Sequence, residues 1–240
     1  HRSVESQPRT GRQVSVALTV NIQQKIFTFV MVYPFHCAKG LKLCNSFSMD
    51  SIDTLRKHLE DKTSFDTHAI QTICRHFQAR SLKREETLFQ KGDRFNQLVF
   101  VADGIMRTYI HNDDGEEIVK HFLTQGDFFA EIDSFEQGSP AGFNVSAITS
   151  CSLAILSQTA SDQLEEKVAG WSYLLKQEAM HAMNNMLRAR EFLSLGEARD
   201  KYRYFVTHYP HLARQVPLKH IAAYLQITQS SLSRIRRQTD

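Results

Sequence analysis

Four glycines divide the middle of the chain into short segments of nearly equal length. Gly92, Gly104, Gly115 and Gly126 follow one another at intervals of twelve, eleven and eleven residues, and apolar runs such as LVFVADGIMRTYI include or separate them. Glycine provides the positive φ that tight turns require, and DDGEE is a turn signal of its own. This spacing predicts successive hairpins in a rolled antiparallel sheet over residues 80–157, with an open meander as the alternative.

Helical periodicity flanks this sheet on both sides. Between residues 49 and 77, apolar positions recur every three to four residues, which predicts two short helices. After the sheet, Thr159 or Ser161 is placed to cap another short helix, and Gly170 is expected to end it. The chain therefore combines helices with an antiparallel sheet, and its predicted fold class is α+β.

A longer helix is predicted from Trp171 to about residue 193, because this stretch contains neither Gly nor Pro. About 22 residues would give a helix of roughly 33 Å. Its apolar stripe includes Trp171, Leu175, Met183 and Met186, spaced at about three to four residues or multiples of that interval. Two interpretations stay open: the stripe packs against the sheet, or part of it forms a two-fold dimer seam.

The distribution of charge separates the end of the chain from its middle. The 240 residues are 42% hydrophobic and 23% charged, which is ordinary for a globular protein with one medium and one small domain. The net charge is −7 over residues 49–196 and +5 over residues 197–240. A basic module on an acidic body is typical of a protein that binds a polyanion.

The cysteines and the first 48 residues indicate a reduced, membrane-free protein. Cys37, Cys44, Cys74 and Cys151 form no C-x-x-C pair, so neither a disulfide framework nor a zinc or iron–sulfur site is predicted. The apolar runs before residue 48 are split by NIQQK and are too short for a membrane span. We interpret residues 1–48 as an extension of the folded protein and expect a cytoplasmic location.

The last part of the chain has the spacing of a helix-turn-helix. In VPLKHIAAYLQITQSSLSRIRRQ, a proline can begin the first helix, whose buried side would comprise Ile221, Ala222 and Leu225. The segment QIT breaks the pattern, and Thr228 can cap a second helix. The inward positions of that second helix would be Leu232 and Ile235.

The outward side chains of the second helix are suited to DNA. Gln229, Ser230, Ser233 and Arg234 would project from its first two turns, where Gln can pair with adenine, Arg with guanine, and Ser with base edges or phosphate. Thr228 would direct the amino end of the helix toward the groove. The cations expected to contact phosphates are Lys219, Arg236 and Arg237. The alternative is a solvated basic helix without a partner.

These motifs occur in a recognisable order. Residues 49–240, with the glycine-punctuated roll, LTQGDFFAEIDSFEQG, the long helix and the terminal IAAYLQITQSSLSRIRRQ, resemble the Crp/Fnr family of bacterial transcription regulators. The resemblance implies a cyclic-nucleotide-binding-type β-roll over 49–158, a short helix and a dimerisation helix over 159–195, and a helix-turn-helix over 196–240. It also implies a homodimer on a palindromic promoter site and, often, contact with RNA polymerase.

The resemblance also allows the family's ligand cassette to be compared with this sequence. Nucleotide-binding members carry Gly-Glu-Leu followed by Arg-Ser or Arg-Thr, whereas here the positions are Ala130-Glu131-Ile132 and Ala141-Gly142. Glu131 can still accept from a ribose hydroxyl, but the cationic phosphate grip is absent, and eight acids against one Lys over residues 113–136 repel an anion. The sequence thus predicts no cyclic nucleotide and no other cofactor, and leaves a different effector or none.

A second departure from the family pattern lies in the turn before the recognition helix. The family usually has Gly there, and this chain has Gln226, which must adopt a conformation that Gly tolerates more easily. The competing class is a metal- or small-molecule-binding roll, a sensor or cupin-like enzyme, without DNA binding. His111, His121 and Glu131 are its candidate ligands, but they lack the His-x-His spacing of such sites, and no catalytic triad is legible. We therefore predict no metal site and no enzymatic activity.

Overall fold

A computed structural model describes residues 51–191 and 196–239. The predicted extension over residues 1–48 lies outside the described residues, as do Cys37 and Cys44. Cys74 and Cys151 are buried free thiols, and burial raises the pKa of each. Both therefore behave as small apolar side chains of the cores.

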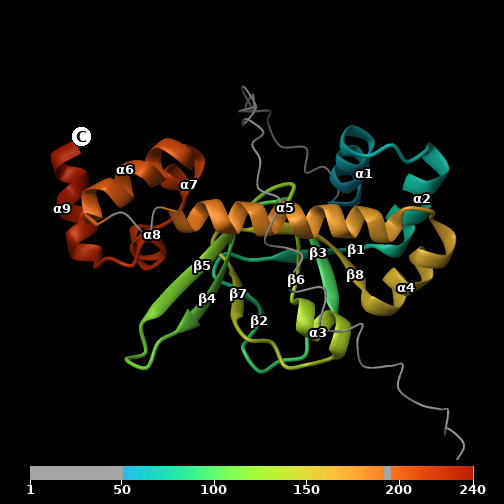
Figure 1. Ribbon diagram of the computed structural model, residues 1–240, viewed down its shortest axis with the longest axis horizontal. Helices are drawn as coiled ribbons and strands as arrows, with labels where there is room; N and C mark the ends of the chain where they lie inside the picture. The colour runs from blue at the N-terminus through green and yellow to red at the C-terminus, as the bar shows by residue number, and fades with distance from the viewer. Residues whose placement is uncertain (1–50, 192–195, 240) are drawn as a thin grey trace, which may run out of the picture. The chain divides into compact units, whose positions relative to one another are not determined.

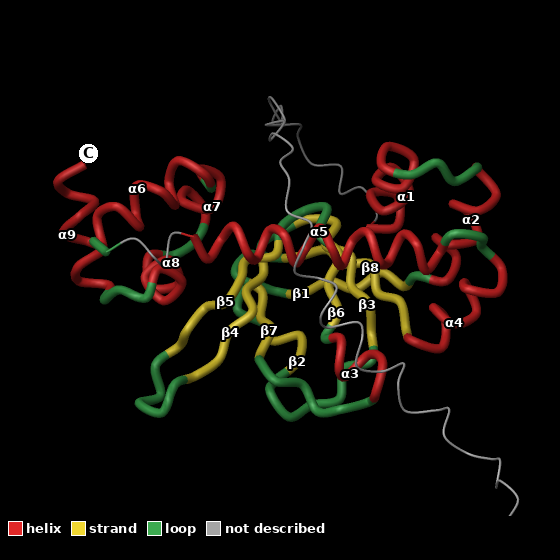
Figure 2. The backbone as a smooth tube through the Cα atoms, in the orientation of Figure 1, coloured by secondary structure: helices red, strands yellow, loops and turns green. Residues whose placement is uncertain are grey.

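The central feature is a β-roll made of two sheets. Among the described residues, eight strands form two four-stranded sheets, in the orders β1-β8-β3-β6 and β2-β7-β4-β5. All pairs are antiparallel. Figure 2 shows the strands in yellow. The strands are β1 Gln78–Leu82, β2 Thr87–Phe89, β3 Gln97–Asp103, β4 Met106–His111, β5 Glu117–Leu123, β6 Phe128–Ala130, β7 Asn144–Ala147 and β8 Cys151–Ser157.

The prediction of a roll is confirmed, but the prediction of successive hairpins is wrong. Within these two sheets only β4 and β5 are both consecutive in sequence and paired. The turns at Gly92, Gly104 and Gly126 instead carry the chain from one sheet to the other. Gly104 cannot be replaced freely, because its φ is +98° and an added Cβ would lie 2.5 Å from the Ser150 carbonyl oxygen. Glycine spacing marks the turns but does not specify which strands pair.

Helices cover the outer face of the first sheet. α1 (Ser51–Lys62) and α2 (Thr67–His76) confirm the two predicted helices. Their apolar sides bury Leu55, Leu59 and Ile73 against β3 and β8. This core also receives Leu164 of α4 (Gln158–Lys167).

The cap of α4 is not the one expected from the sequence. Ser157, the last residue of β8, has extended backbone angles, and its hydroxyl accepts from the Ala160 N–H. The helix therefore begins directly at the strand end, before Thr159. Ser161 is instead buried within the helix, where its oxygen accepts from the Trp171 indole N–H at 3.0 Å.

The long helix α5 (Trp171–Glu191) begins at the predicted residue (Figure 1). Its first turns belong to the core, since Trp171 is 1% exposed and Leu174 is 8% exposed. After it come α6 (Ala198–His208), α7 (Pro210–Gln215), α8 (Leu218–Leu225) and α9 (Gln229–Thr239). None of the described helices is long and apolar enough to cross a membrane.

The C-terminal helices enclose a core of their own, which continues onto the roll. Leu225 and Leu232 are fully buried and join α8 to α9. Phe205 of α6 lies in the same cluster, as do Val119 and Phe122 of β5. This cluster therefore connects the C-terminal helices to the outer face of the β4–β5 pair.

Candidate nucleic-acid interface

The helix-turn-helix is closed by one residue in a left-handed conformation. Gln226 ends α8 with φ 55° and ψ 47°, as the sequence required of a residue at the usual Gly position. The Gln226 and Ile227 N–H groups both donate to the Ala222 carbonyl, which terminates the helix in the manner of a C-cap. A non-glycine residue in this region costs about 1–2 kcal/mol. Leu225 before it is fully buried, and Ile227 after it packs half-buried against the same core.

Thr228 caps α9, the second helix of the helix-turn-helix, as predicted. Its hydroxyl oxygen accepts from the Ser231 N–H at 3.2 Å and lies 2.8 Å from the Ser231 hydroxyl. The Ser230 hydroxyl is 3.0 Å away. These contacts hold the first turn of α9 with its hydroxyl groups and backbone N–H groups at the positive end of the helix dipole.

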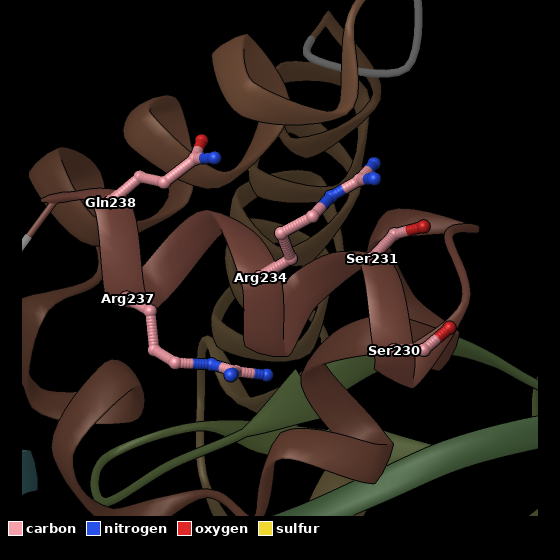
Figure 3. A pocket seen from close by; sticks show the side chains of 5 residues that line it. All are labelled: Ser230, Ser231, Arg234, Arg237 and Gln238. Atoms are coloured by element: carbon pink, nitrogen blue, oxygen red, sulfur yellow. The ribbon is translucent and has the colours of Figure 1, made fainter.

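The outward face of α9 is polar and cationic. Ser230, Arg234, Arg237 and Gln238 are exposed, and together with half-buried Ser231 they line one hollow (Figure 3). The opposite side of the helix is held in the core by Leu232 and Ile235. This surface can offer hydroxyl, amide and guanidinium groups to a groove of DNA.

The structure distributes the predicted DNA-binding residues over two strips of α9. Ser230, Arg234 and Arg237 share the hollow, whereas Gln229, Ser233 and Arg236 are not among its lining residues. Ser231 and Gln238 were missed by the sequence reasoning. The signal that could have found them is the spacing of 0, 1, 4, 7 and 8 from Ser230, which marks one face of a helix.

The arginines of α9 are available for phosphate. No ion pair involving Arg234, Arg236 or Arg237 is found in the described part of the chain. Lys219 on α8 is also exposed. Arg203 of α6 differs, because it lies 2.7 Å from Asp200 and is partly neutralised.

The position of the family's ligand cassette lies in the roll. Glu131 is 7% exposed, and its carboxylate accepts from the Ser134 N–H at 2.6 Å as the N-cap of α3 (Ile132–Gln137). Ala130, just before it, is half-buried at the end of β6. The one acid that could hold a ribose hydroxyl therefore already stabilises a helix end.

Where the family pattern has its cation, this chain has a buried alanine. Ala141 is 3% exposed, and its backbone bonds to Asp93 and Gly92 close the loop before β7. Gly142 is exposed beside it. The structure brings Ala141 into the apolar cluster of the roll interior.

Phenylalanines fill this part of the roll. The Phe89 and Phe95 rings stack with centroids 4.3 Å apart, and the Phe89 centroid lies 6.1 Å from that of Phe129 and 5.8 Å from that of Phe143. Phe129 and Phe143 approach to 6.0 Å edge to face. Such aromatic packing is apolar and well matched in shape, so it offers no polar partners for a phosphate.

The alternative metal ligands are not brought together. No group of three or more potential metal ligands is found among residues 51–191 and 196–239. His111 is exposed and faces the Tyr109 ring edge to face. Burial lowers the pKa of His121 despite the nearby Asp127 carboxylate, which favours the neutral imidazole.

The long helix changes character along its length. Trp171 is buried and Leu175 packs against the core beside it. Further along, Met180 is 47% exposed, Met183 and Met186 are each 39% exposed, and Leu187 is 55% exposed. The first part of the predicted stripe is therefore core, and the second part is an apolar surface.

The fold and these residues define a class: a cyclic-nucleotide-binding-type β-roll joined by a long helix to a helix-turn-helix. Residues 79–167 match the family model of the cyclic nucleotide-binding domain. This match falls on the β-roll and agrees with the resemblance of the chain to the Crp/Fnr regulators.

The similar curated proteins are transcription regulators. Over 95 residues the chain is 29% identical to the cAMP-activated global transcriptional regulator CRP of Escherichia coli O6:H1, covering 40% of this chain and 45% of that protein. Over 109 residues it is 29% identical to the cAMP-activated global transcriptional regulator Vfr of Pseudomonas aeruginosa, covering 44% and 51%. The matched segments thus span about half the length of these relatives.

Solved structures share the fold. The c-di-GMP responsive global regulator CLP of Xanthomonas campestris superposes with a TM-score of 0.58 at 17% identity, over 72% of this chain and 91% of that one. A CRP-family transcriptional regulator from Thermus thermophilus gives 0.56 at 18% identity, over 66% and 83%. At these identities the likeness concerns the architecture alone.

Proposed function

We propose that this protein is a sequence-specific DNA-binding transcription regulator that acts as a homodimer on a palindromic site. The observation that carries the proposal is the face of α9, where Ser230, Arg234 and Arg237 are exposed on a helix capped by Thr228. Two such helices in one dimer would enter successive major grooves about 34 Å apart. The similar curated proteins are likewise named as regulators rather than as enzymes.

The test of DNA binding is selection of bound duplexes from a random pool by the full chain, followed by gel-shift titration. We expect a palindromic consensus and affinity at least about a thousandfold above that for scrambled DNA. Equal affinity for selected and scrambled duplexes would contradict a sequence-specific function. Contact with RNA polymerase and a cytoplasmic location belong to the same proposal and follow the resemblance to the family.

The exposed half of α5 supports the dimer. Met183 and Met186 form an apolar strip that a second copy of the same helix would cover, and methionine packs adaptably at such seams. Met183→Glu should shift the protein from dimer to monomer in sedimentation velocity. Lys176→Glu on the same helix is the control for charge alone. If the Met183→Glu variant remains a dimer, the dimer interface lies elsewhere.

The roll supports regulation by something other than a cyclic nucleotide, or by no effector. Glu131 is engaged as a helix cap, Ala141 stands at the position of the cation, and four phenylalanines fill the adjacent space. A phosphate placed there would lose its hydration without gaining a cation. Isothermal titration with cyclic AMP and cyclic GMP should detect no binding in the micromolar range, and micromolar affinity would contradict this part of the proposal.

A further inference from the structure

Polar side chains of α8 and the roll meet where α8 packs against the roll. His220 of α8 is 2% exposed, and its Nδ1 donates to Glu117 Oε1 of β5 at 2.8 Å. The same carboxylate accepts from Arg107 of β4, at 3.1 Å from Nε and 3.4 Å from Nη2. Arg107 is itself only 6% exposed. One carboxylate thus joins the first helix of the helix-turn-helix to two strands of the roll.

A fourth residue closes the cluster from a third segment. The Glu85 carboxylate, in the turn between β1 and β2, lies 3.6 Å from Arg107 Nη1 and 3.7 Å from His220 Nε2. These two nitrogens are buried and have no hydrogen-bond partner of their own among the described residues. Glu85 has φ 63°, a region that side chains other than Gly enter at a cost. The turn holds this strained conformation while presenting its carboxylate to Arg107 and His220.

The contacts around this cluster are apolar and do not by themselves fix the orientation of α8 on the sheet. Ile221 and Leu225 of α8 pack against Val119 and Phe122 of β5, which the bulge between them places on the same face of the sheet. The side chains of α6 and α9 in this core include Phe205 and Leu232. Apolar burial is non-directional, so it attracts α8 to the sheet but permits sliding and rotation.

Directional hydrogen bonds to Glu117 fix the orientation of α8 that the apolar contacts leave open. Burial alone would raise the pKa of Glu117, but the hydrogen bond from His220 and the guanidinium of Arg107 lower it below its ordinary value. Glu117 is therefore ionised, and moving α8 away from it would break the hydrogen bond from His220 and leave that buried imidazole nitrogen without its partner. The Tyr109 ring, 4.8 Å from the Arg107 guanidinium carbon, adds a further contact that holds Arg107 in place.

We propose that Glu117, Arg107 and His220 form an interdomain clamp, a set of positioning residues that fixes the recognition helix α9 relative to the β-roll. None of the three lies on the exposed face of α9, so they act through α8, against which α9 packs. The consequence for DNA rests on the proposed function, because a dimer reads two half-sites only when both recognition helices have the correct orientation. The docking itself does not depend on that function.

The docking is tested by hydrogen–deuterium exchange of the full chain carrying Glu117→Gln. Gln has the same shape but no charge, so α8 amides should exchange roughly tenfold faster or more, the scale of a typical coupling between sites. Amides of β3 and β8 serve as an internal control, because unchanged exchange there shows that the roll stays folded. Glu116→Gln is the matched control, because Glu116 is the neighbouring acid, is exposed, and bonds to Asn112.

The second variant is His220→Gln, with His208→Gln as its control. His208 is an exposed histidine of α6, so its replacement leaves the interdomain clamp intact. His220→Gln should reproduce the faster exchange of α8, and the double variant with Glu117→Gln should add little to either change, since both remove one interaction. Exchange within about twofold of wild type in both single variants would overturn the proposal.

Gel shifts separate positioning from simple loss of structure. Both variants should lose roughly tenfold or more in affinity for the selected palindrome, while the affinity for scrambled DNA and its dependence on salt stay as in wild type. If the wild-type protein selects no DNA sequence, the proposed function fails and the exchange data alone decide on the interdomain clamp. If wild type binds specifically and both variants bind the palindrome equally well, the positioning role is wrong.

Discussion

Polar groups are engaged inside the β-roll but exposed on the outward face of α9. In the roll, Glu131 is engaged as a helix cap and phenylalanines fill the space beside Ala141. On α9, hydroxyl and guanidinium groups are exposed, and no ion pair with its arginines is found in the described residues. A ligand site must leave polar groups available, and this difference supports the proposal that α9, rather than the roll, carries the binding activity.

The largest expected effect comes from returning a cation to the roll. Ala141→Arg would place a guanidinium in the apolar cluster that includes Phe89 and Phe143. An unpaired buried charge should destabilise the protein by about 3–5 kcal/mol, measured by chemical denaturation. Gly142→Ser is the control, because Gly142 is exposed and a Cβ there meets nothing within 4 Å. A stable Ala141→Arg variant that binds cyclic AMP would show that the roll is an open site after all.

The next effect tests whether α9 reads bases. Arg234→Ala should cost about 1–3 kcal/mol on the selected duplex and relax specificity at one base pair. Arg236→Ala, the matched arginine outside the hollow, should weaken binding to selected and scrambled duplexes alike and reduce the salt slope by about one. Gel-shift titrations on both duplexes measure each change. Equal losses on both duplexes for Arg234→Ala would mean that Arg234 contacts phosphate and does not read a base.

A smaller effect tests the cap that presents this face. Thr228→Ala removes the oxygen that accepts from the Ser231 N–H, and should cost about 1 kcal/mol of stability in a thermal melt. Thr228→Ser retains the oxygen and should restore most of the loss. If Thr228→Ala melts like wild type, the first turn of α9 is held by its core contacts and not by the cap.

The elements with strong local signals could be predicted from the sequence. Trp171 as the start of α5 and Thr228 as a cap are decided by neighbouring residues, whereas the left-handed conformation of Gln226 was expected from the family resemblance. Strand pairing could not be predicted, because the turns at Gly92 and Gly104 look the same whether the chain stays in one sheet or crosses to the other. Local signals specify a turn, whereas long-range packing specifies its partners.

The candidate sites divide in the same way. Arg234 and Ser230 follow from helical spacing, and their placement needs only the helix and its buried side. The pairing of His220 with Glu117, 103 positions apart, could not be found from spacing, because neither residue has a distinctive neighbour pattern. The same holds for Phe89 and Phe143, which meet only when the roll closes.

The smallest expected effect is the pH dependence of stability that comes from Glu117. It tests the polar cluster between α8 and the roll, in contrast to the exposed face of α9. Because the pKa of Glu117 is lowered in the folded protein, its stabilising contribution is present above its ordinary value of 4.5 and is lost as the pH falls through the lowered value. Wild type should therefore lose more thermal stability between about pH 5 and pH 3 than Glu117→Gln, which has no carboxylate to protonate. Glu116→Gln should follow wild type, since its carboxylate is exposed. The difference is measured as the separation of melting temperatures along the pH series, and parallel curves for all three proteins would mean that the buried contacts of Glu117 add nothing to folding beyond those of an exposed acid.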